Sequence, residues 1–147
     1  DKVYTRARIL PPSKIRKTTI DEVIFPGGSI VHEATIDRSV IGIRTRIEEG
    51  TTVKSSILMG IDYYETLEEI AAIKKKGNQP HMGIGKNCHI ENAIIDKNCS
   101  IGNNVTIRGG AGLEDTETDT YCIRDGIIIL KKGAIVQEGT VSGNALN

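Results

Sequence analysis

The stretch Ile36-Asp37-Arg38-Ser39-Val40-Ile41-Gly42 returns in outline 54 positions later as Ile90-Glu91-Asn92-Ala93-Ile94-Ile95-Asp96. In each copy two aliphatic residues stand five positions apart, and outward from both copies an aliphatic residue recurs every five or six positions. This ladder comprises Ile24, Ile30, Ile36, Ile41, Ile47, Val53, Leu58, Ile84, Ile90, Ile95, Ile101, Ile107, Ile129, Ile135 and Val141. Its spacing matches neither the period of a helix nor that of a single strand. Three steps add up to roughly 17 to 18 residues, which is short enough for one coil of a parallel β-helix.

Small residues accompany the ladder. One stands four positions after most of its members, and these residues are Gly28, Ala34, Thr45, Thr51, Cys88, Cys99, Val105, Gly133 and Gly139. The pattern resembles the hexapeptide repeat of left-handed β-helices, in which the aliphatic residue fills a triangular prism and the small residue packs near a corner. A β-sandwich of short strands is the alternative, but it requires alternation with a period of two. We therefore expect an all-β fold, a left-handed parallel β-helix with one helical insertion, whose inward-pointing residues include Ile30, Ile36, Ile41, Ile47, Ile90, Ile95 and Ile101.

The first interruption of the ladder, about residues 62–82, has the signals of a helix from Thr66 to Lys76. Thr66 and Glu69 form a capping-box pattern at its start. The run Lys74-Lys75-Lys76 faces the negative end of the helix, which favours a helix terminus over a binding patch. An apolar stripe, which we expect to lie on the wall of the prism, is formed by Leu67, Ile70 and Ile73.

The second interruption, about residues 108–125, has glycines followed by acidic residues, and we expect a surface loop. Its glycines lack the strand-to-helix setting of a phosphate-binding loop, so we give them no nucleotide role.

Residues 1–18 contain Pro11 and Pro12 and are expected to form an extended linker that arrives from a preceding domain. The β-helix domain is then expected to span residues 19–147.

Composition agrees with one domain and excludes some kinds of partner. The chain has 147 residues, 3% aromatic residues and no tryptophan, which fits a narrow interior of stacked aliphatic side chains. Nineteen Lys and Arg residues balance 19 Asp and Glu residues, whereas a nucleic-acid-binding domain would be basic. No apolar run approaches the roughly 20 residues that span a bilayer. We therefore expect a soluble, intracellular protein with neither nucleic acid nor membrane as partner.

The three cysteines include no Cys-x-x-Cys pair. Cys88 and Cys99 occupy small-residue positions of the repeat, so they are expected to fill the core rather than to bind zinc, which needs converging ligands. Cys122 lies in an irregular stretch, where only Arg124 would favour its reactivity. No metal site is predicted.

Several stretches, in one order along the chain, carry a family resemblance: Tyr4-Thr5 with Leu10-Pro11-Pro12-Ser13-Lys14, Leu58-Met59-Gly60-Ile61-Asp62-Tyr63-Tyr64-Glu65-Thr66, Gly83-Ile84-Gly85-Lys86-Asn87, Ile94-Ile95-Asp96-Lys97-Asn98 and Asp125-Gly126-Ile127-Ile128-Ile129-Leu130-Lys131-Lys132. Together they resemble the C-terminal region of the ADP-glucose pyrophosphorylases (glucose-1-phosphate adenylyltransferases), the plant and cyanobacterial type more than the enteric bacterial type. Two features depart from the family pattern. The segment Arg108-Gly109-Gly110-Ala111-Gly112 replaces an Asn-Lys-Asp segment, and the tail 142–147 runs past the usual end.

The resemblance implies a parent enzyme that forms ADP-glucose and pyrophosphate from ATP and glucose-1-phosphate in glycogen or starch synthesis. In the family this chemistry, with its ATP and Mg²⁺, belongs to an N-terminal catalytic domain with a glycine-rich nucleotide loop, which this sequence lacks. The chain is therefore expected to hold no cofactor and to be inactive alone. The expected location is the cytoplasm of a bacterium or the plastid stroma.

The resemblance also implies that the β-helix packs on its own catalytic domain, contributes to a homo- or hetero-tetramer and helps to bind a small anionic effector such as 3-phosphoglycerate or phosphate. Two effector lysines of the family correspond to Lys97 and Lys132, with Lys131 as the alternative if the register is shifted by one. A lysine ammonium suits this role because it is a mobile point charge with three donors. Without the resemblance, each would be interpreted as a solvated surface lysine.

A hexapeptide-repeat acyltransferase is the second hypothesis. In that class a histidine at a cleft between subunits acts as general base on a coenzyme A substrate. His89 is the best-placed candidate, and His32 and His81 are the others. The helical insertion and the entry segment Leu10-Pro11-Pro12-Ser13-Lys14 do not belong to that pattern, so the first hypothesis is preferred.

Overall fold

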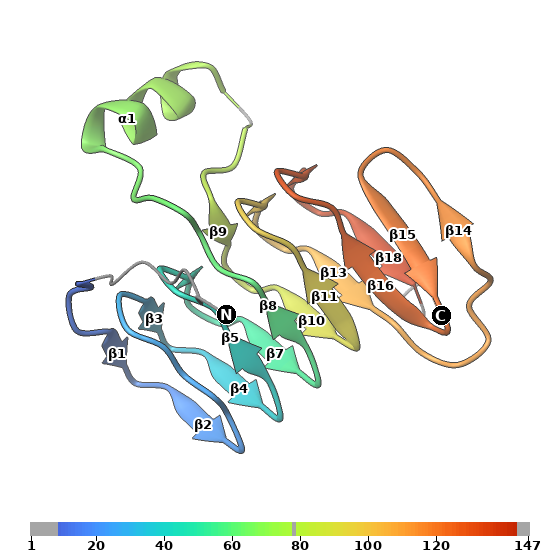
Figure 1. The fold of residues 1–147 in the computed structure, drawn as a ribbon. Coiled ribbons are helices and arrows are strands. Elements are labelled where there is room, and N and C mark those ends of the chain that lie inside the picture. Colours follow the sequence, from blue (N-terminus) through green and yellow to red (C-terminus); the bar gives the residue numbers. More distant parts are fainter. Residues whose placement is uncertain (1–8, 78, 144–147) are drawn as a thin grey trace, which may run out of the picture.

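The computed structural model describes residues 9–77 and 79–143, and it is a parallel β-helix with three walls (Figure 1). Wall 1 stacks β1 (Lys14–Arg16), β3 (Ile30–His32), β6 (Arg46–Ile47), β9 (Gly83–Ile84), β12 (Ser100–Ile101) and β17 (Ile135–Val136). Wall 2 stacks β2 (Thr19–Asp21), β4 (Thr35–Asp37), β7 (Thr52–Lys54), β10 (His89–Glu91), β13 (Thr106–Arg108) and β18 (Val141–Gly143). Wall 3 stacks β5 (Val40–Ile41), β8 (Ile57–Leu58), β11 (Ala93–Ile95), β16 (Ile127–Leu130), β15 (Tyr121–Arg124) and β14 (Thr116–Glu117).

The interior is filled by one column of aliphatic side chains from each wall. In-register pairing builds these columns from Val31, Ile47, Ile84 and Ile101 on wall 1, Ile36, Val53, Ile90 and Ile107 on wall 2, and Ile41, Leu58, Ile95 and Leu130 on wall 3. Each of these side chains is at most 5% exposed. Their removal from water is the main stabilising contribution. Six of the seven inward residues predicted from the sequence are confirmed.

The prediction for Ile30 is wrong. Val31 takes the interior position at 1% exposure, and Ile30 faces outward and is half-buried. Because successive residues of a strand face opposite sides, only one of two adjacent aliphatic residues can enter the core. Four other ladder members also lie outside the interior. Either an adjacent residue takes the interior position or the ladder residue lies at an open end of the prism. These residues are Ile24, Ile129, Ile135 and Val141. In their place the neighbours Phe25, Ile128, Leu130 and Val136 pack in or against the core.

The 54-residue offset between the repeated stretches follows from coil stacking around the helical insertion. Ile36 pairs with Val53, 17 residues on, and Val53 pairs with Ile90, 37 residues on. The second step is 20 residues longer because the chain leaves the prism between β8 and β9. The two stretches therefore lie two coils apart rather than on adjacent coils.

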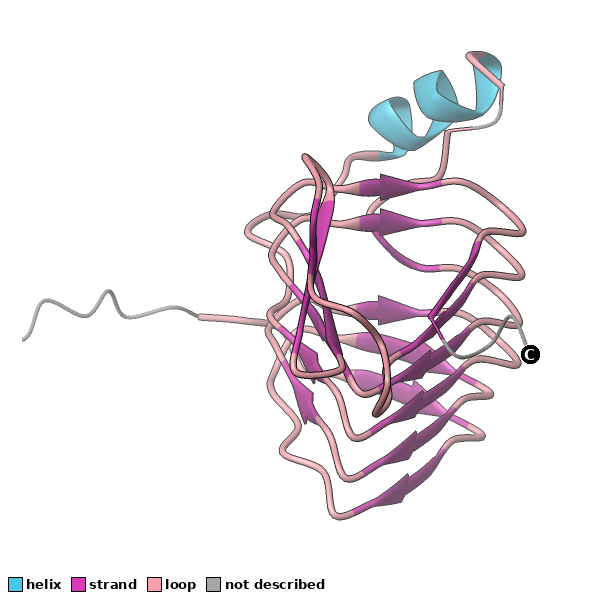
Figure 2. Ribbon diagram, turned by 90° about the vertical axis from the view of Figure 1, so that its right-hand side faces the viewer, coloured by secondary structure: helices cyan, strands magenta, loops and turns pink. Residues whose placement is uncertain are grey.

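Helix α1 (Leu67–Lys75) begins and ends as predicted, with Thr66 as its N-cap. The Glu69 N–H donates to Thr66 Oγ1 at 3.1 Å, and the Thr66 N–H donates to the Glu69 carboxylate at 2.7 Å. The predicted contact between its apolar stripe and the prism is wrong, since no residue of the helix is buried and Leu67 is 85% exposed. Figures 1 and 2 show α1 held outside the stack of strands. The Met82 N–H donates to the Glu65 carboxylate at 3.2 Å and joins the two connecting segments, so the helix projects outward.

The described residues contain no helix that is long and apolar enough to cross a membrane.

The second insertion is a β-hairpin rather than the predicted loop. Strands β14 and β15 pair antiparallel, and β15 also pairs antiparallel with β16. Tyr121 and Ile123 are half-buried and pack against the core. The hairpin therefore covers the edge of β16, whose backbone groups would otherwise be unpaired.

The first coil begins at β1, so the β-helix starts near Lys14 rather than at residue 19. Lys14 is in register with Ile30, and its N–H donates to the Ser29 carbonyl oxygen at 2.8 Å. Residues 9–13 precede β1 without forming a strand. The rest of the predicted linker, residues 1–8, and most of the predicted tail, residues 144–147, lie outside the described residues.

Cys88 and Cys99 are confirmed as core residues, at 3% and 4% exposure. Burial raises the pKa of both thiols, that of Cys99 to about 11, whereas Cys122 is partly exposed.

Because the thiolate is the reactive form, we expect a disulfide reagent at neutral pH to label one thiol per folded chain, that of Cys122, quickly. The other two should react only after unfolding. The control is Cys122→Ser, and fast labelling that persists in this variant would contradict the burial of Cys88 and Cys99.

Candidate anion-binding site

Lys97 and Lys132 lie at the corner where wall 3 leads into wall 1, on two neighbouring coils. Ile95 is in register with Leu130, and a lysine follows each of them two residues later. The Gly133 N–H donates to the Lys97 carbonyl oxygen at 2.9 Å, which keeps the coils paired through the corner. Neighbouring strands are about 4.8 Å apart. The fold thereby brings together two of the three lysines that were predicted as effector ligands.

The carboxylate of Asp62 lies between these lysines. Its Oδ1 is 3.1 Å from Lys97 Nζ, and its Oδ2 is 4.0 Å from Lys132 Nζ. Asn98 Nδ2 donates to Asp62 Oδ2 at 3.1 Å, and the Asp62 N–H donates to Asn98 Oδ1 at 2.9 Å. The hydrogen bond from Asn98, followed by that from Lys97, lowers the pKa of Asp62 below its ordinary value. We refer to Asp62, Lys97, Asn98 and Lys132 as the corner cluster.

Asp62 reaches the corner because the chain leaves the wall at Gly60. Gly60 has a φ of +95°, and a Cβ there would lie 2.5 Å from the Ile43 carbonyl oxygen. Only glycine adopts this backbone conformation readily. The Gly60 carbonyl oxygen still accepts from the Asn98 N–H at 3.2 Å. The chain thus turns outward into the insertion while it stays paired with the next coil.

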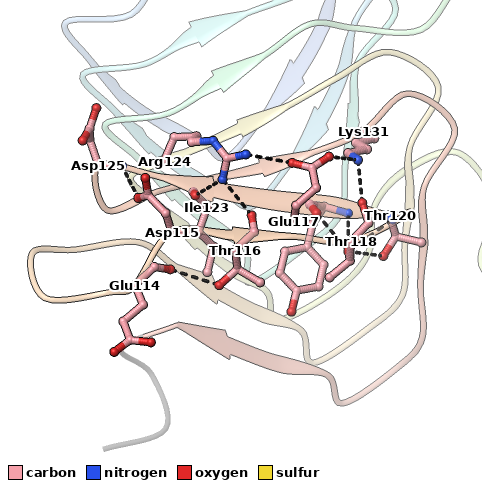
Figure 3. Close-up of polar contacts among 11 residues, drawn as sticks. Glu114, Asp115, Thr116, Glu117, Thr118, Thr120, Ile123, Arg124, Asp125 and Lys131 are labelled. Carbon is pink, nitrogen blue, oxygen red and sulfur yellow. Dashed lines mark hydrogen bonds and ion pairs between the residues drawn. The ribbon is translucent and has the colours of Figure 1, made fainter.

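Lys131 points toward the β14–β15 hairpin (Figure 3). Its ammonium donates to the Glu117 carboxylate and to the Thr118 carbonyl oxygen. Arg124 Nη2 donates to the other oxygen of Glu117 at 3.0 Å. The hydrogen bond from Lys131 is the main cause that lowers the pKa of Glu117. A shift of one residue, from Lys132 to Lys131, therefore moves the ammonium from the corner to the hairpin. An effector role for any of the three lysines stays a prediction.

Residues 8–141 match the family model described as the GLGC left-handed parallel beta-helix domain. The chain belongs to this family. The match covers both insertions, the corner cluster and every strand of the walls except the last two residues of β18. It confirms the predicted left-handed β-helix and the family resemblance seen in the sequence.

This GLGC domain is also similar to the small subunit of a glucose-1-phosphate adenylyltransferase, named chloroplastic/amyloplastic, from wheat (Triticum aestivum). The two are 41% identical over 141 residues, which is 95% of this chain. The chain spans 30% of the length of the wheat protein.

The three histidines of the GLGC domain lie on separate parts of the chain. His89 on β10 has its Nε2 3.6 Å from a Glu91 oxygen, and His32 on β3 has its Nε2 3.6 Å from a Glu33 oxygen. Neither Nε2 atom has a hydrogen-bond partner among the described residues. His81 Nδ1 lies 3.2 Å from the Met82 carbonyl oxygen, just before β9. The family membership favours the adenylyltransferase hypothesis over the acyltransferase one.

Within the described ranges, no group of three or more His, Cys, Asp or Glu side chains is arranged to hold a metal ion.

Proposed function

We propose that this chain is the C-terminal regulatory and oligomerisation domain of a glucose-1-phosphate adenylyltransferase, which forms ADP-glucose and pyrophosphate from ATP and glucose-1-phosphate. In this proposal Lys97 and Lys132 contribute to a site for a small anionic effector of the phosphate or 3-phosphoglycerate type. The supporting observation is the placement of both lysines on neighbouring coils of a domain that belongs to the GLGC family. Its test is the response of lysine variants of the complete enzyme to the effector.

A phosphate group suits the corner chemically. It carries about −1.5 to −2 charges at neutral pH and three acceptor oxygens, and each lysine ammonium offers three donors. The side chains of Lys97 and Lys132 are 35% and 64% exposed, so an anion has access to both from solvent. Exposed charges bind weakly because water and salt screen them. This chain alone therefore binds the effector weakly, and further basic ligands come from the catalytic domain.

The outer face of wall 3 supports a role in assembly. In-register pairing stacks an outward aliphatic column of Ile24, Val40, Ile57, Ile94 and Ile129. Ile24 is 70% exposed and Ile57 is 41% exposed. Contiguous exposed apolar surface is typical of protein–protein contacts. The proposed partners are the enzyme's own N-terminal catalytic domain and the neighbouring subunits of a homo- or hetero-tetramer.

The proposed location is the plastid stroma, because the wheat relative is named chloroplastic/amyloplastic, with a bacterial cytoplasm as the alternative. ATP and Mg²⁺ are proposed to bind in the catalytic domain. The glycine-rich nucleotide loop that positions them in the family is not present in this sequence. In this proposal the chain regulates and assembles the enzyme and does not carry its active site.

The 147-residue chain is expected to form no ADP-glucose from ATP, glucose-1-phosphate and Mg²⁺. Phosphoryl-transfer chemistry of this kind depends on positioning and charge neutralisation by a nucleotide-binding domain. The measurement is pyrophosphate release by the purified chain, with a parallel purification from cells that do not express the chain to detect contaminating enzyme. If pyrophosphate release scales with the concentration of the chain and persists after repeated purification, the active site is not confined to the catalytic domain.

A further inference from the structure

The corner cluster contains an anion of its own. Asp62 presents one carboxylate oxygen to Lys97 and the other to Lys132, at 3.1 Å and 4.0 Å. It belongs to neither of the coils that carry the lysines, because it is contributed by the segment that leads from β8 to α1. The carboxylate therefore stands where an effector phosphate would meet the same two ammonium groups.

A second carboxylate nearby is not available to the lysine ammonium groups in this way. Asp96 Oδ1 accepts a hydrogen bond from the backbone N–H of Lys97 at 2.6 Å, which fixes it on the backbone side of the corner. No ion pair joins Asp96 to a lysine ammonium among the described residues, whereas Asp62 contacts both ammonium groups. Asp62 is thus the acid that an incoming anion has to displace.

The Asp62 carboxylate and a phosphate cannot share the lysines without a cost. Two unit charges of the same sign 4 Å apart repel by about 1 kcal/mol even in bulk water, and by more near a protein surface. A phosphate of nearly two charges roughly doubles this repulsion. Conversely, the carboxylate keeps two lysines on neighbouring coils from repelling each other when no effector is bound.

We infer that Asp62 is an internal competitor of the anionic effector, which occupies Lys97 and Lys132 in the free state and sets the effector concentration needed to displace it. This inference rests on the proposed effector site. Asp62 is then a specificity-determining residue, because an anion must carry more charge or more acceptor oxygens than a carboxylate to exchange with it. Phosphate and phosphorylated acids satisfy this condition, and chloride or a simple carboxylate does not.

The exchange needs only a side-chain movement. The Asp62 backbone N–H remains bonded to Asn98 Oδ1 at 2.9 Å whichever way its carboxylate turns. Other contacts also anchor the insertion: Arg44 Nη1 donates to the Ile61 carbonyl oxygen at 3.3 Å, Tyr64 Oη to the Gly28 carbonyl oxygen at 2.9 Å, and the Met82 N–H to Glu65 at 3.2 Å. Loss of the Asp62 charge should therefore change anion affinity and leave the fold intact.

The test is a titration of the 147-residue chain with inorganic phosphate at pH 7.5 and constant ionic strength, followed by backbone amide shifts in NMR spectra. We expect Asp62→Asn, which keeps the size of the side chain, to lower the Kd for phosphate by roughly 3- to 30-fold. Asp62→Ala should act in the same direction. The matched control is Glu117→Gln, which removes one negative charge beside Lys131 instead and should leave the Kd within about twofold of the unaltered chain.

Three outcomes decide between the proposals. Tighter phosphate binding in both Asp62 variants and not in Glu117→Gln supports the competition. Equal phosphate affinity in Asp62→Asn and the unaltered chain, with binding still lost in Lys97→Ala/Lys132→Ala, overturns the role of Asp62 and leaves the effector site standing. Phosphate binding that does not respond to the two lysines overturns both. Unchanged thermal denaturation midpoints of the variants exclude misfolding as the cause.

Discussion

Alanine at Lys97 or at Lys132 is expected to raise the effector concentration for half-maximal response of the complete enzyme by on the order of 5- to 150-fold. An effector shifts a conformational equilibrium only by its differential affinity for the two states. Removal of one charge-assisted contact takes about 1–3 kcal/mol from that difference. The activity at saturating effector should stay nearly unchanged, because neither lysine belongs to the catalytic domain. The measurement is ADP-glucose synthesis against phosphate or 3-phosphoglycerate concentration.

The neighbouring lysine provides a matched control. Lys131→Ala removes the same charge one residue away, but its ammonium contacts Glu117 and the Thr118 carbonyl oxygen rather than the corner cluster. We expect this variant to keep the effector response. Arginine at Lys97 or Lys132 should restore it partly, because the charge survives while the geometry changes. An unchanged response in both alanine variants would make these lysines ordinary surface residues and leave the domain with a structural role only.

The fold could be predicted from the sequence because one coil repeats one pattern. The aliphatic spacing specifies the number of residues per coil, and stacking of coils then buries most of the ladder residues against their equivalents on the next coil. The pattern does not decide between adjacent aliphatic residues, such as Ile30 and Val31, because both fit the spacing. That choice is made by pairing with the next coil, where Val31 is in register with Ile47.

The position of α1 could not be predicted for a different reason. Its capping box and its limits are local, and the sequence specifies them. The contact between its apolar stripe and the wall depends on the segments that connect the helix to β8 and β9. The hydrogen bond from the Met82 N–H to the Glu65 carboxylate holds these segments together. The half-buried Ile70 and Ile73 and the exposed Leu67 show that the periodicity of a helix indicates an apolar face without indicating what covers it.

The candidate site was only partly predictable. The family resemblance identified Lys97 and Lys132, and their equivalent positions after Ile95 and Leu130 could have suggested that they are neighbours. The repeat pattern predicts no role for Asp62, because this residue lies beyond the regular coil. Leu58 stands in register with Ile95, so the residues that follow Leu58 enter the same corner. That register is the signal that would have placed Asp62 beside the lysines.

The largest expected effect on stability comes from the core, where Ile95→Ala should lower the free energy of unfolding by about 2–5 kcal/mol. Ile95 is 5% exposed and is stacked between Leu58 and Leu130, so its truncation leaves a cavity shared by three coils. A single domain is stable by only about 5–15 kcal/mol. The loss is therefore a large fraction of the total, and it should appear as a lower urea midpoint at an unchanged slope.

The adjacent residue tests the orientation of the strand. Ile94→Ala removes the same atoms from the outer face of β11, where the side chain is only half-buried. We expect this variant to lose less than about 1.5 kcal/mol, because little cavity forms at a surface that solvent can reach. An equal loss in the two variants would mean that the two isoleucines are equally buried in solution. Ile94 and Ile95 share one strand, so a difference between their losses of unfolding free energy reflects the direction of the two side chains. The comparison therefore tests the strand register that also places Lys97, two residues after Ile95, at the corner.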